Sequence, residues 1–375
     1  MSKSTQAKAI IDKLLSATGL TINGGQSCDI QVHNDRFYNR VLAGGSLALG
    51  ESYLEGWWDV EELDEFFYRL LKADLGTKVR NNWPAIYRIV LAKLFNSQSR
   101  ARAFKIGEHH YDVDASVYQA MLGKTMTYTC GYWQGGVSNL DEAQMAKLDL
   151  VCKKIGLKSG DRVLDIGCGW GSFAKLAAEK YGAQVVGLTV SKNQVQYAKD
   201  HYQNLPIDIR FQDYREVNEK FDQIVSLGMF EHVGVKNYRT YMAVARRCLK
   251  DDGLFLLHTI GSNRSVISTD PWISKYIFPN SMLPSIAQIG QAIENIFVME
   301  DWQNFGADYD KTLMAWHQNF MANWVGAGEP KDERFVRMWR YYLLSCAGSF
   351  RARKNQLWQV VLSANGVSGG YKSIR

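Results

Sequence analysis

The stretch 162–171, RVLDIGCGWG, constrains the fold of this chain more than any other. Its first half supplies the apolar residues of a short buried strand, and three glycines follow at spacing two: Gly167, Gly169 and Gly171. Residues 172–181, SFAKLAAEKY, then have helix-forming composition. Glycines let a ligand approach the backbone, and the N-terminus of a helix presents free N–H groups. The stretch therefore predicts a strand, a turn and a helix that cradle a small ligand.

The glycine spacing narrows the class of ligand. It reads GxGxG, so the GxGxxG fingerprint of dinucleotide folds is absent, and no acid follows about 20 residues on to hold a ribose. The chain also has no GxxxxGK[ST] loop, which disfavours a nucleoside triphosphate. Asp165, just before the first glycine, suits a cation or a ligand ammonium. The pattern resembles the S-adenosylmethionine (SAM) loop of class I methyltransferases. The alternative is a turn that merely permits close packing of strand and helix.

A repeating strand–helix pattern surrounds this loop. We expect strands at 162–166, 184–188, 207–211, 223–226 and 254–259, and helices at 172–181, 192–202 and 237–249. Such alternation predicts an α/β fold with a doubly wound parallel sheet and with ligands at the carboxyl ends of its strands. Further helices are expected at 141–155, 310–325 and 332–344, a loop-rich insertion at 270–285, and a last strand at 357–362.

The N-terminal part has a different organisation. Apolar residues recur at helical spacing in 10–15 and 63–71, and another helix is expected at 84–95. Between them, the stretch 44–59 is rich in Gly and Trp, and we interpret Trp57 and Trp58 as core or interface anchors. We therefore predict a small, mainly helical domain over 1–105, followed by a Rossmann-like catalytic domain over 106–375.

Composition excludes several classes of protein. An apolar content of 46% over 375 residues indicates a globular chain. Six scattered cysteines with no CxxC pair favour free thiols over disulfides or a metal site. The N-terminus mixes charges into its apolar residues, unlike a signal peptide, and no uncharged apolar run approaches the ~20 residues of a membrane span. These features predict a cytoplasmic protein.

The net charge of +6 is unevenly distributed. Residues 75–107 contain seven cations and no acid, and residues 334–375 contain eight cations and no acid. This segregation suggests a basic surface that faces nucleic acid or an anionic lipid surface. Apolar residues interleave with the cations of the first stretch, which favours a peripheral membrane face over nucleic acid. The alternative is two amphipathic helices with solvated basic faces.

Several polar residues follow strands of the predicted sheet. Glu231 comes just past the fourth strand and His258 ends the fifth, so both are expected at the edge that holds the glycine loop. A carboxylate between Phe230 and Val233 is costly unless it is hydrogen-bonded. Taken singly, these residues also have ordinary interpretations: Glu231 as a cap or ion-pair acid, His258 as a buried histidine, Tyr309 as a surface tyrosine, and Cys130 and Cys346 as core hydrophobes.

Taken together, the motifs resemble one family. They are GSLALGESYLEGWWD, MTYTCGYW, VLDIGCGWGSFA, GLTVSKNQ, QDYR, GMFEHVG, LLHTIG, WISKYIFPNSMLPS, NFGADYD and YYLLSCAGSFRAR. In this order they resemble the cyclopropane-fatty-acyl-phospholipid synthases, bacterial SAM-dependent lipid enzymes, and they cover almost the whole chain. The catalytic half alone is also similar to the mycolic-acid cyclopropane synthases, which lack the N-terminal domain.

The resemblance implies a reaction and its residues. The family transfers a methyl group from SAM to a cis double bond of a phospholipid acyl chain, and the resulting cation loses a proton and closes to a cyclopropane. A bicarbonate ion is the base, and its site would be Cys130, Glu231, His258, Ile260 and Tyr309, with Cys130 and Ile260 acting mainly through their backbone. Cys346 matches a cysteine that the family has been thought to use. SAM would be held by Gly167, Gly169, Gly171, Thr189, Gln194, Gln212 and Asp213, with Asp165 beside it and Tyr128 and Thr129 closing over it.

The resemblance also implies partners. The substrate is an unsaturated phospholipid in the bilayer, so we expect peripheral association with the inner face of the membrane, a homodimer, no metal and no nucleic acid. A cationic intermediate needs a dry, aromatic pocket. The candidates for lining it are Tyr128, Tyr132, Trp133, Phe230, Trp272, Tyr276 and Phe278.

Overall fold

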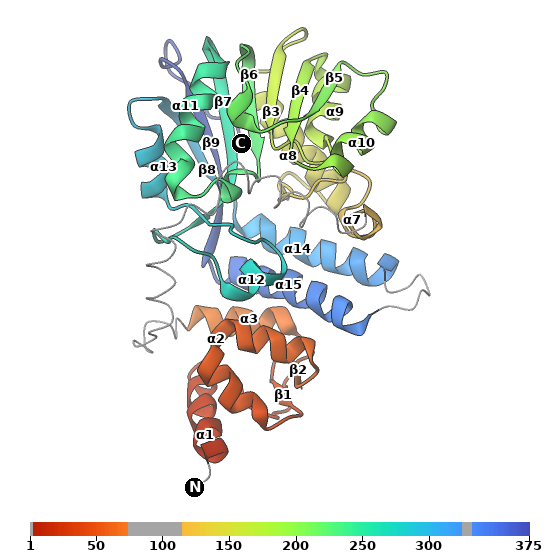
Figure 1. The fold of residues 1–375 in the computed structure, drawn as a ribbon, viewed down its shortest axis with the longest axis vertical. Coiled ribbons are helices and arrows are strands. Elements are labelled where there is room, and N and C mark those ends of the chain that lie inside the picture. Colours follow the sequence, from red (N-terminus) through yellow and green to blue (C-terminus); the bar gives the residue numbers. More distant parts are fainter. Residues whose placement is uncertain (1–2, 74–114, 325–331) are drawn as a thin grey trace.

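The computed structural model describes residues 3–73, 115–324 and 332–375. Figure 1 shows a sheet with flanking helices at one end of the molecule and the N-terminal helices at the other, with further helices between them. The first acid-free basic stretch and the helix expected at 84–95 lie outside the described residues. The N-terminal helices are α1 (Lys3–Ser16), α2 (Arg36–Leu54) and α3 (Leu63–Lys72), and the intervening ones are α7 (Ala115–Leu122), α12 (Pro271–Tyr276), α14 (Ala307–Asn319) and α15 (Glu333–Arg351).

The sheet has seven strands in the order β5-β4-β3-β6-β7-β9-β8. In chain order they are β3 (Arg162–Ile166), β4 (Gln184–Thr189), β5 (Ile207–Phe211), β6 (Phe221–Leu227), β7 (Leu249–Ser262), β8 (Val298–Asn304) and β9 (Asn355–Ser363). The first five are parallel, as predicted. The last strand is antiparallel to both of its neighbours, so the sheet is mixed rather than wholly parallel. The apolar residues of β9 do not determine whether the strand runs parallel or antiparallel to its neighbours. Its direction depends on where the chain re-enters the sheet after α14 and α15.

Two cores cover the two faces of the sheet, because neighbouring strand residues point to opposite sides. Leu164 packs with α11 (Tyr238–Cys248) and α13 (Ile286–Ile293). Val163 packs with α8 (Leu140–Lys154) and α9 (Ser172–Tyr181). Helix α10 (Lys192–His201) lies beside β4 and β5. The α/β fold expected from the strand–helix pattern is confirmed.

Several elements after residue 115 differ from expectation. The insertion at 270–285 contains the short helix α12, because Asp270 accepts hydrogen bonds from the N–H groups of Trp272 and Ile273 and Pro271 occupies the first turn. Helix α14 continues as a π-helical turn over Phe320–Trp324. The edge strand β8 and helix α13 were not predicted, since VMEDWQN lacks a clear apolar period and α13 is short.

The Gly- and Trp-rich stretch forms most of α2, which the composition did not predict. Gly45 has φ 58° and ψ −138°, so the helix is interrupted there at a conformation that favours glycine. A two-stranded ribbon of β1 (Gln31–Val32) and β2 (Trp58–Asp59) completes the N-terminal unit. Trp58 is fully buried and donates from its indole to the carbonyl of Leu49 at 3.0 Å, as expected of a core anchor.

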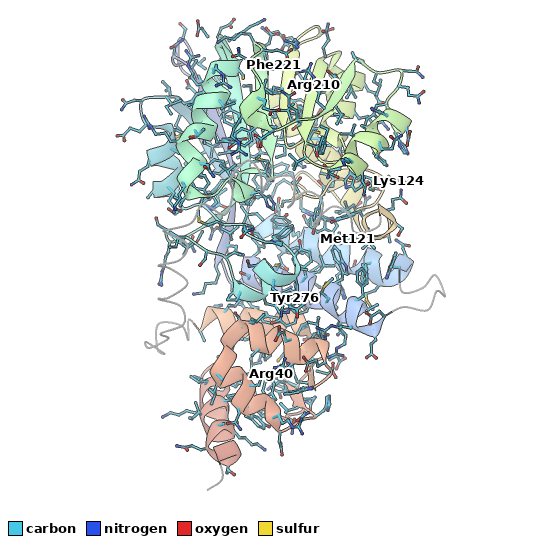
Figure 2. The ribbon with its side chains drawn as sticks, viewed as in Figure 1. Arg40, Met121, Lys124, Arg210, Phe221 and Tyr276 are labelled. Atoms are coloured by element: carbon cyan, nitrogen blue, oxygen red, sulfur yellow. The ribbon has the colours of Figure 1, made fainter. Side chains whose placement is uncertain are left out.

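Helix α15 joins the N-terminal unit to the rest of the chain. Arg337 donates to the carbonyls of Tyr53 and Trp58. Arg351 pairs with Asp64 of α3 at 2.8 Å and with Asp310 of α14 at 2.9 Å. Figure 2 labels Tyr276 where α12 meets the N-terminal helices, and its hydroxyl lies 3.2 Å from Glu51 of α2.

These contacts change the interpretation of the second basic stretch. At least five of its eight cations have partners within the chain: Arg337, Arg340, Arg351, Arg353 and Arg375. The second stretch is therefore not a free basic face, because α15 uses its arginines to hold the N-terminal unit. A single core cluster extends from α1–α3 through α15 to α7 and α14.

Candidate active site

The first cavity, which we call the sheet-edge cavity, encloses about 170 Å³ at the carboxyl ends of β3, β4, β5 and β6. Nine of the predicted SAM-binding residues line it: Tyr128, Thr129, Asp165, Gly167, Gly169, Thr189, Gln194, Gln212 and Asp213. Parallel strands end together at one edge, so residues from 128 to 213 meet in one place.

The three glycines of the loop have two different roles. Gly167 (φ 81°) and Gly169 (φ 56°) line the cavity, and a Cβ at Gly167 would lie 2.6 Å from Cβ of Met229. Gly171 is absent from the wall: it has φ 81° and caps α9, and a Cβ there would lie 2.7 Å from the Tyr202 ring. The structure thus gives Gly171 a packing role and does not include it in the lining of this cavity.

Asp165 is the buried anion of the sheet-edge cavity. Its side chain is 1% exposed, and its Oδ1 has no hydrogen-bond partner. Burial raises the pKa of Asp165 to about 7, although the charge of nearby Lys147 opposes the shift. A buried carboxylate oxygen without a partner is costly, and a ligand ammonium would satisfy it.

Two other polar side chains that line this cavity are held by hydrogen bonds within the chain. The Thr189 hydroxyl donates to Oε1 of Gln194 at 2.6 Å. The Asp213 carboxylate accepts two hydrogen bonds from the Arg215 guanidinium, at 2.8 and 2.6 Å. The charge of Asp213 is therefore balanced by Arg215, so a ligand in this cavity does not meet an unpaired anion at Asp213.

The second cavity, the aromatic cavity, encloses about 410 Å³ between the N-terminal unit and the sheet. Its ring-bearing wall residues include Tyr128, Trp272, Phe278, Tyr309, Tyr341, Tyr342 and Phe350. Helices α2 and α3 contribute Ser46, Leu49, Phe67, Leu70 and Leu71. Four separate parts of the chain thus build one largely apolar chamber.

Four of the aromatic residues predicted to line this pocket do not do so: Tyr132, Trp133, Phe230 and Tyr276. Phe230, for instance, stacks on Tyr238 at 4.2 Å in the core of the sheet. The aromatic side chains of α15 take their place. The sequence YYLLSCAGSF indicates that these aromatic residues share one face of a helix. It does not indicate which part of the molecule that face contacts.

The two cavities meet at Tyr128, Thr129, Gly228 and His232, which line both. At Gly228 (φ 77°), a Cβ would lie 2.6 Å from Cγ2 of Thr129. Gly228 and His232 were not among the predicted site residues, although both belong to the GMFEHVG motif that contains the predicted Glu231. Burial lowers the pKa of His232 to about 4, so its imidazole is neutral at this junction.

Glu231 presents a buried carboxyl group to the aromatic cavity. Its Oε1 accepts a hydrogen bond from the backbone N–H of Ile260 at 2.6 Å, and its Oε2 has no partner. Burial raises the pKa of Glu231 to about 7. No salt bridge of Glu231 occurs among the described residues, so nothing there supports the ion-pair interpretation.

The other predicted bicarbonate residues divide into two groups. Ile260 and Tyr309 line the aromatic cavity with Glu231, whereas Cys130 and His258 are buried and are not part of its lining. The Cys130 thiol is 3.7 Å from Oγ1 of Thr312. The Gln359 amide nitrogen lies 3.3 Å from Nδ1 of His258 and donates to it in this orientation of the amide. The proton of the neutral ring is then on Nε2, which has no partner.

Cys346 also lines the aromatic cavity, but burial raises the pKa of its thiol to about 12. The thiolate needed for nucleophilic chemistry is therefore disfavoured. All six cysteines are free, as predicted. In the ranges that the structure describes, no group of His, Cys, Asp or Glu could hold a metal, and no helix is long and apolar enough to cross a membrane.

The fold and the glycine loop define a class I SAM-dependent methyltransferase. Solved structures share this architecture. The cyclopropane synthase MmaA2 from Mycobacterium tuberculosis has a TM-score of 0.65 at 30% identity, covering 69% of this chain and 97% of its own. The mycolic acid cyclopropane synthase CmaA1, complexed with SAH and CTAB, has a TM-score of 0.64 at 33% identity, with the same two coverages.

The chain belongs to the mycolic acid cyclopropane synthetase family, whose model matches residues 98–360. The cyclopropane-fatty-acyl-phospholipid synthase of Escherichia coli strain K12 is 52% identical over 366 residues, 98% of this chain and 95% of the relative. The expectation of a SAM-dependent cyclopropane synthase is thereby confirmed.

Proposed function

We propose that this chain converts a cis double bond of an unsaturated phospholipid acyl chain into a cyclopropane ring, with SAM as the methyl donor and bicarbonate as the base. The observation that carries the proposal is the junction of the two cavities at Tyr128, Thr129, Gly228 and His232. A polar donor site and an apolar acceptor site with a common wall allow a sulfonium and an alkene to be held in line. An alkene is a weak nucleophile, so such positioning supplies much of the rate.

The sheet-edge cavity fits the amino-acid and ribose parts of SAM. The unpartnered Oδ1 of Asp165 would accept from the methionine ammonium, and Gly169 leaves open space where a side chain would intrude. Thr189, Gln194 and Gln212 supply further polar groups. The methyl carbon would then point through the junction toward the aromatic cavity.

The aromatic cavity fits an acyl chain. Its apolar walls exclude water, and its tyrosine and tryptophan faces stabilise a cation that forms on the chain after methyl transfer. The N-terminal helices would act as a lipid-contacting domain, since Leu49 and Leu70 complete the wall opposite the sheet.

The residues around Glu231 fit a small oxyanion with one O–H group. Oε2 of Glu231 is a buried acceptor without a partner, and His258 Nε2 is a buried donor without one, outside the lining of the aromatic cavity. Bicarbonate, when bound, supplies the base that takes a proton from the methylated chain. Glu231 would orient it by accepting its O–H, with Tyr309 as a donor.

We also propose that the enzyme binds an anionic membrane surface at the inner face of the membrane and that it is a dimer. The apolar chamber suits an acyl chain drawn from a bilayer, and the first basic stretch, outside the described residues, would supply cations that bind its surface. Replacing Arg88, Lys93 and Arg100 together with Gln should weaken binding to anionic vesicles, more at low than at high salt. Vesicle flotation measures this, and unchanged binding would place the membrane face elsewhere.

The decisive experiment incubates the purified chain with SAM and vesicles of unsaturated phospholipid, with and without bicarbonate. We expect a product heavier by one CH₂ group whose double bond has been consumed, formed faster with bicarbonate. Mass spectrometry before and after catalytic hydrogenation under mild conditions distinguishes a ring from a methylene branch. A product that keeps its double bond, or no product, would contradict the proposed reaction. Equal rates with and without bicarbonate would contradict only the proposal that bicarbonate is the base.

A further inference from the structure

Two lysines of α8, Lys147 and Lys154, are fully buried and lie seven residues apart on one helix. Lys154 has an evident structural role: its ammonium donates to Oε1 of Gln303 at 2.5 Å and lies 4.0 Å from Asp301, which ties α8 to β8. Lys147 has no such role and lines the sheet-edge cavity instead. A buried ammonium is costly unless it is paired, so its placement at this site needs an explanation.

The partner of Lys147 is a residue of the junction between the cavities. Its ammonium donates to Oγ1 of Thr129 at 2.7 Å. One turn earlier on α8, the Gln144 amide donates to the carbonyl oxygen of Thr129 at 2.7 Å. Helix α8 therefore holds both the hydroxyl and the backbone of Thr129, whose methyl group packs against Gly228.

Lys147 lines the same cavity as Asp165, and each group influences the ionisation of the other. Burial lowers the pKa of Lys147 to about 7, and Cys130 and Asp165 oppose the shift.

We infer that Lys147 is a positioning residue for methyl transfer, which acts by holding Thr129 at the junction where the sulfonium meets the double bond. The inference rests on the proposed SAM site. Holding the wall in place affects the transfer step more than the binding of SAM, because Thr129 lies between donor and acceptor rather than at the glycine loop.

The test compares Lys147→Met with the matched control Lys154→Met, which removes an equally buried ammonium from the same helix. We expect Lys147→Met to lower kcat about 10- to 100-fold, the range for losing a hydrogen bond from a charged group, while the Kd of SAM changes less than about threefold. Lys154→Met should lower the melting temperature and leave kcat within about threefold. Equal losses of kcat in the two variants would overturn the inference, since burial alone would then explain both.

A double-mutant cycle measures the coupling between Lys147 and Thr129, which a purely structural role of Lys147 would not produce. Thr129→Val removes the hydroxyl and keeps the branched shape. We expect it to lower kcat as Lys147→Met does, and the double variant to be no worse than the poorer single one. Additive losses, or a Thr129→Val variant with unchanged kcat, would overturn the inference, and the latter measurement stands even if Lys147→Met does not fold.

Calorimetry with SAM keeps the two hypotheses apart. If the unmodified protein does not bind SAM, the proposed function fails. If the unmodified protein binds SAM and makes product, and Lys147→Met does so at the same rate, only the role of Lys147 fails.

Discussion

The sheet-edge cavity and the aromatic cavity share four wall residues, yet the chain builds them in different ways. The first is lined by residues 127–233 alone, from the ends of neighbouring strands. The second draws on residues 46–71, 128–129, 228–283 and 309–355. A donor site can thus be encoded within one continuous half of a fold, whereas this acceptor site needs the N-terminal helices and α15 to be packed in place.

The difference extends to the chemistry of the walls. The sheet-edge cavity has a buried anion, Asp165, and a buried cation, Lys147. The aromatic cavity has a single deeply buried acid, Glu231, among rings and aliphatic side chains. Changes in one cavity should therefore affect donor binding, and changes in the other should affect turnover or the lipid, unless they alter the common wall.

The largest expected effect separates the base from the donor. Glu231→Gln keeps the size of the side chain but replaces the unpartnered carboxylate oxygen. We expect kcat to fall about 100-fold or more, the scale of general-base assistance, with the Kd of SAM unchanged. Single-turnover rates and calorimetry measure the two quantities. Weakened SAM binding in this variant would show that the two cavities do not function separately.

The next effect tests the division of roles within the glycine loop. Gly167→Ala places a Cβ against Met229 at positive φ, and we expect the Kd of SAM to rise about tenfold or more. Gly171→Ala has a similar backbone strain but contacts the Tyr202 ring. It should lower the melting temperature with a smaller change in the Kd of SAM. If both variants weaken SAM binding equally, Gly171 belongs to the binding site after all.

A substitution in α2 tests whether the N-terminal unit contributes to the acceptor site. Leu49→Trp adds a ring to the wall of the aromatic cavity. We expect kcat/KM for phospholipid to fall about tenfold, most for long acyl chains, at unchanged SAM affinity. Leu42→Trp, on the same helix but 41% exposed, is the control. A full loss of SAM binding in Leu49→Trp would indicate disrupted folding rather than a filled cavity.

The smallest effect is a pH dependence of turnover. Because burial raises the pKa of Glu231 to about 7, the group is ionised above that pH and protonated below it. A protonated carboxyl group no longer accepts an O–H at both oxygens, so kcat should fall about fivefold between pH 7 and pH 6. The profile is measured at constant bicarbonate concentration. In Glu231→Gln the fall in kcat below pH 7 should be absent. If the fall persists in that variant, another titratable group causes it.

Much of the sheet-edge cavity could be predicted from the sequence. The glycine spacing and the apolar strands before it are local signals, and nine of the ten residues predicted for SAM lie in one wall. Gly171 was the exception, because the motif does not reveal that Tyr202 packs on its Cα. Lys147 was not predicted either, since a lysine on an amphipathic helix usually faces solvent.

The aromatic cavity could not be predicted to the same extent. Phe230 and Tyr276 were expected in its wall and lie elsewhere, while Tyr341 and Tyr342 of α15 lie in it. Their positions depend on how α15 packs against α3 and α14, and on arginine contacts such as that of Arg351 with Asp310. The acid-free C-terminal stretch suggested a membrane face because its sequence does not show which residues its arginines contact inside the molecule.

By itself, the sequence determined the α/β architecture, the glycine loop and the family, because strand period, turn conformation and motif order are properties of short segments. Only the tertiary structure decided that Glu231 and Asp165 are buried with unpartnered oxygens and that two cavities meet at Thr129. Burial and pairing arise when distant segments exclude water from one another, and no single stretch of sequence contains that information.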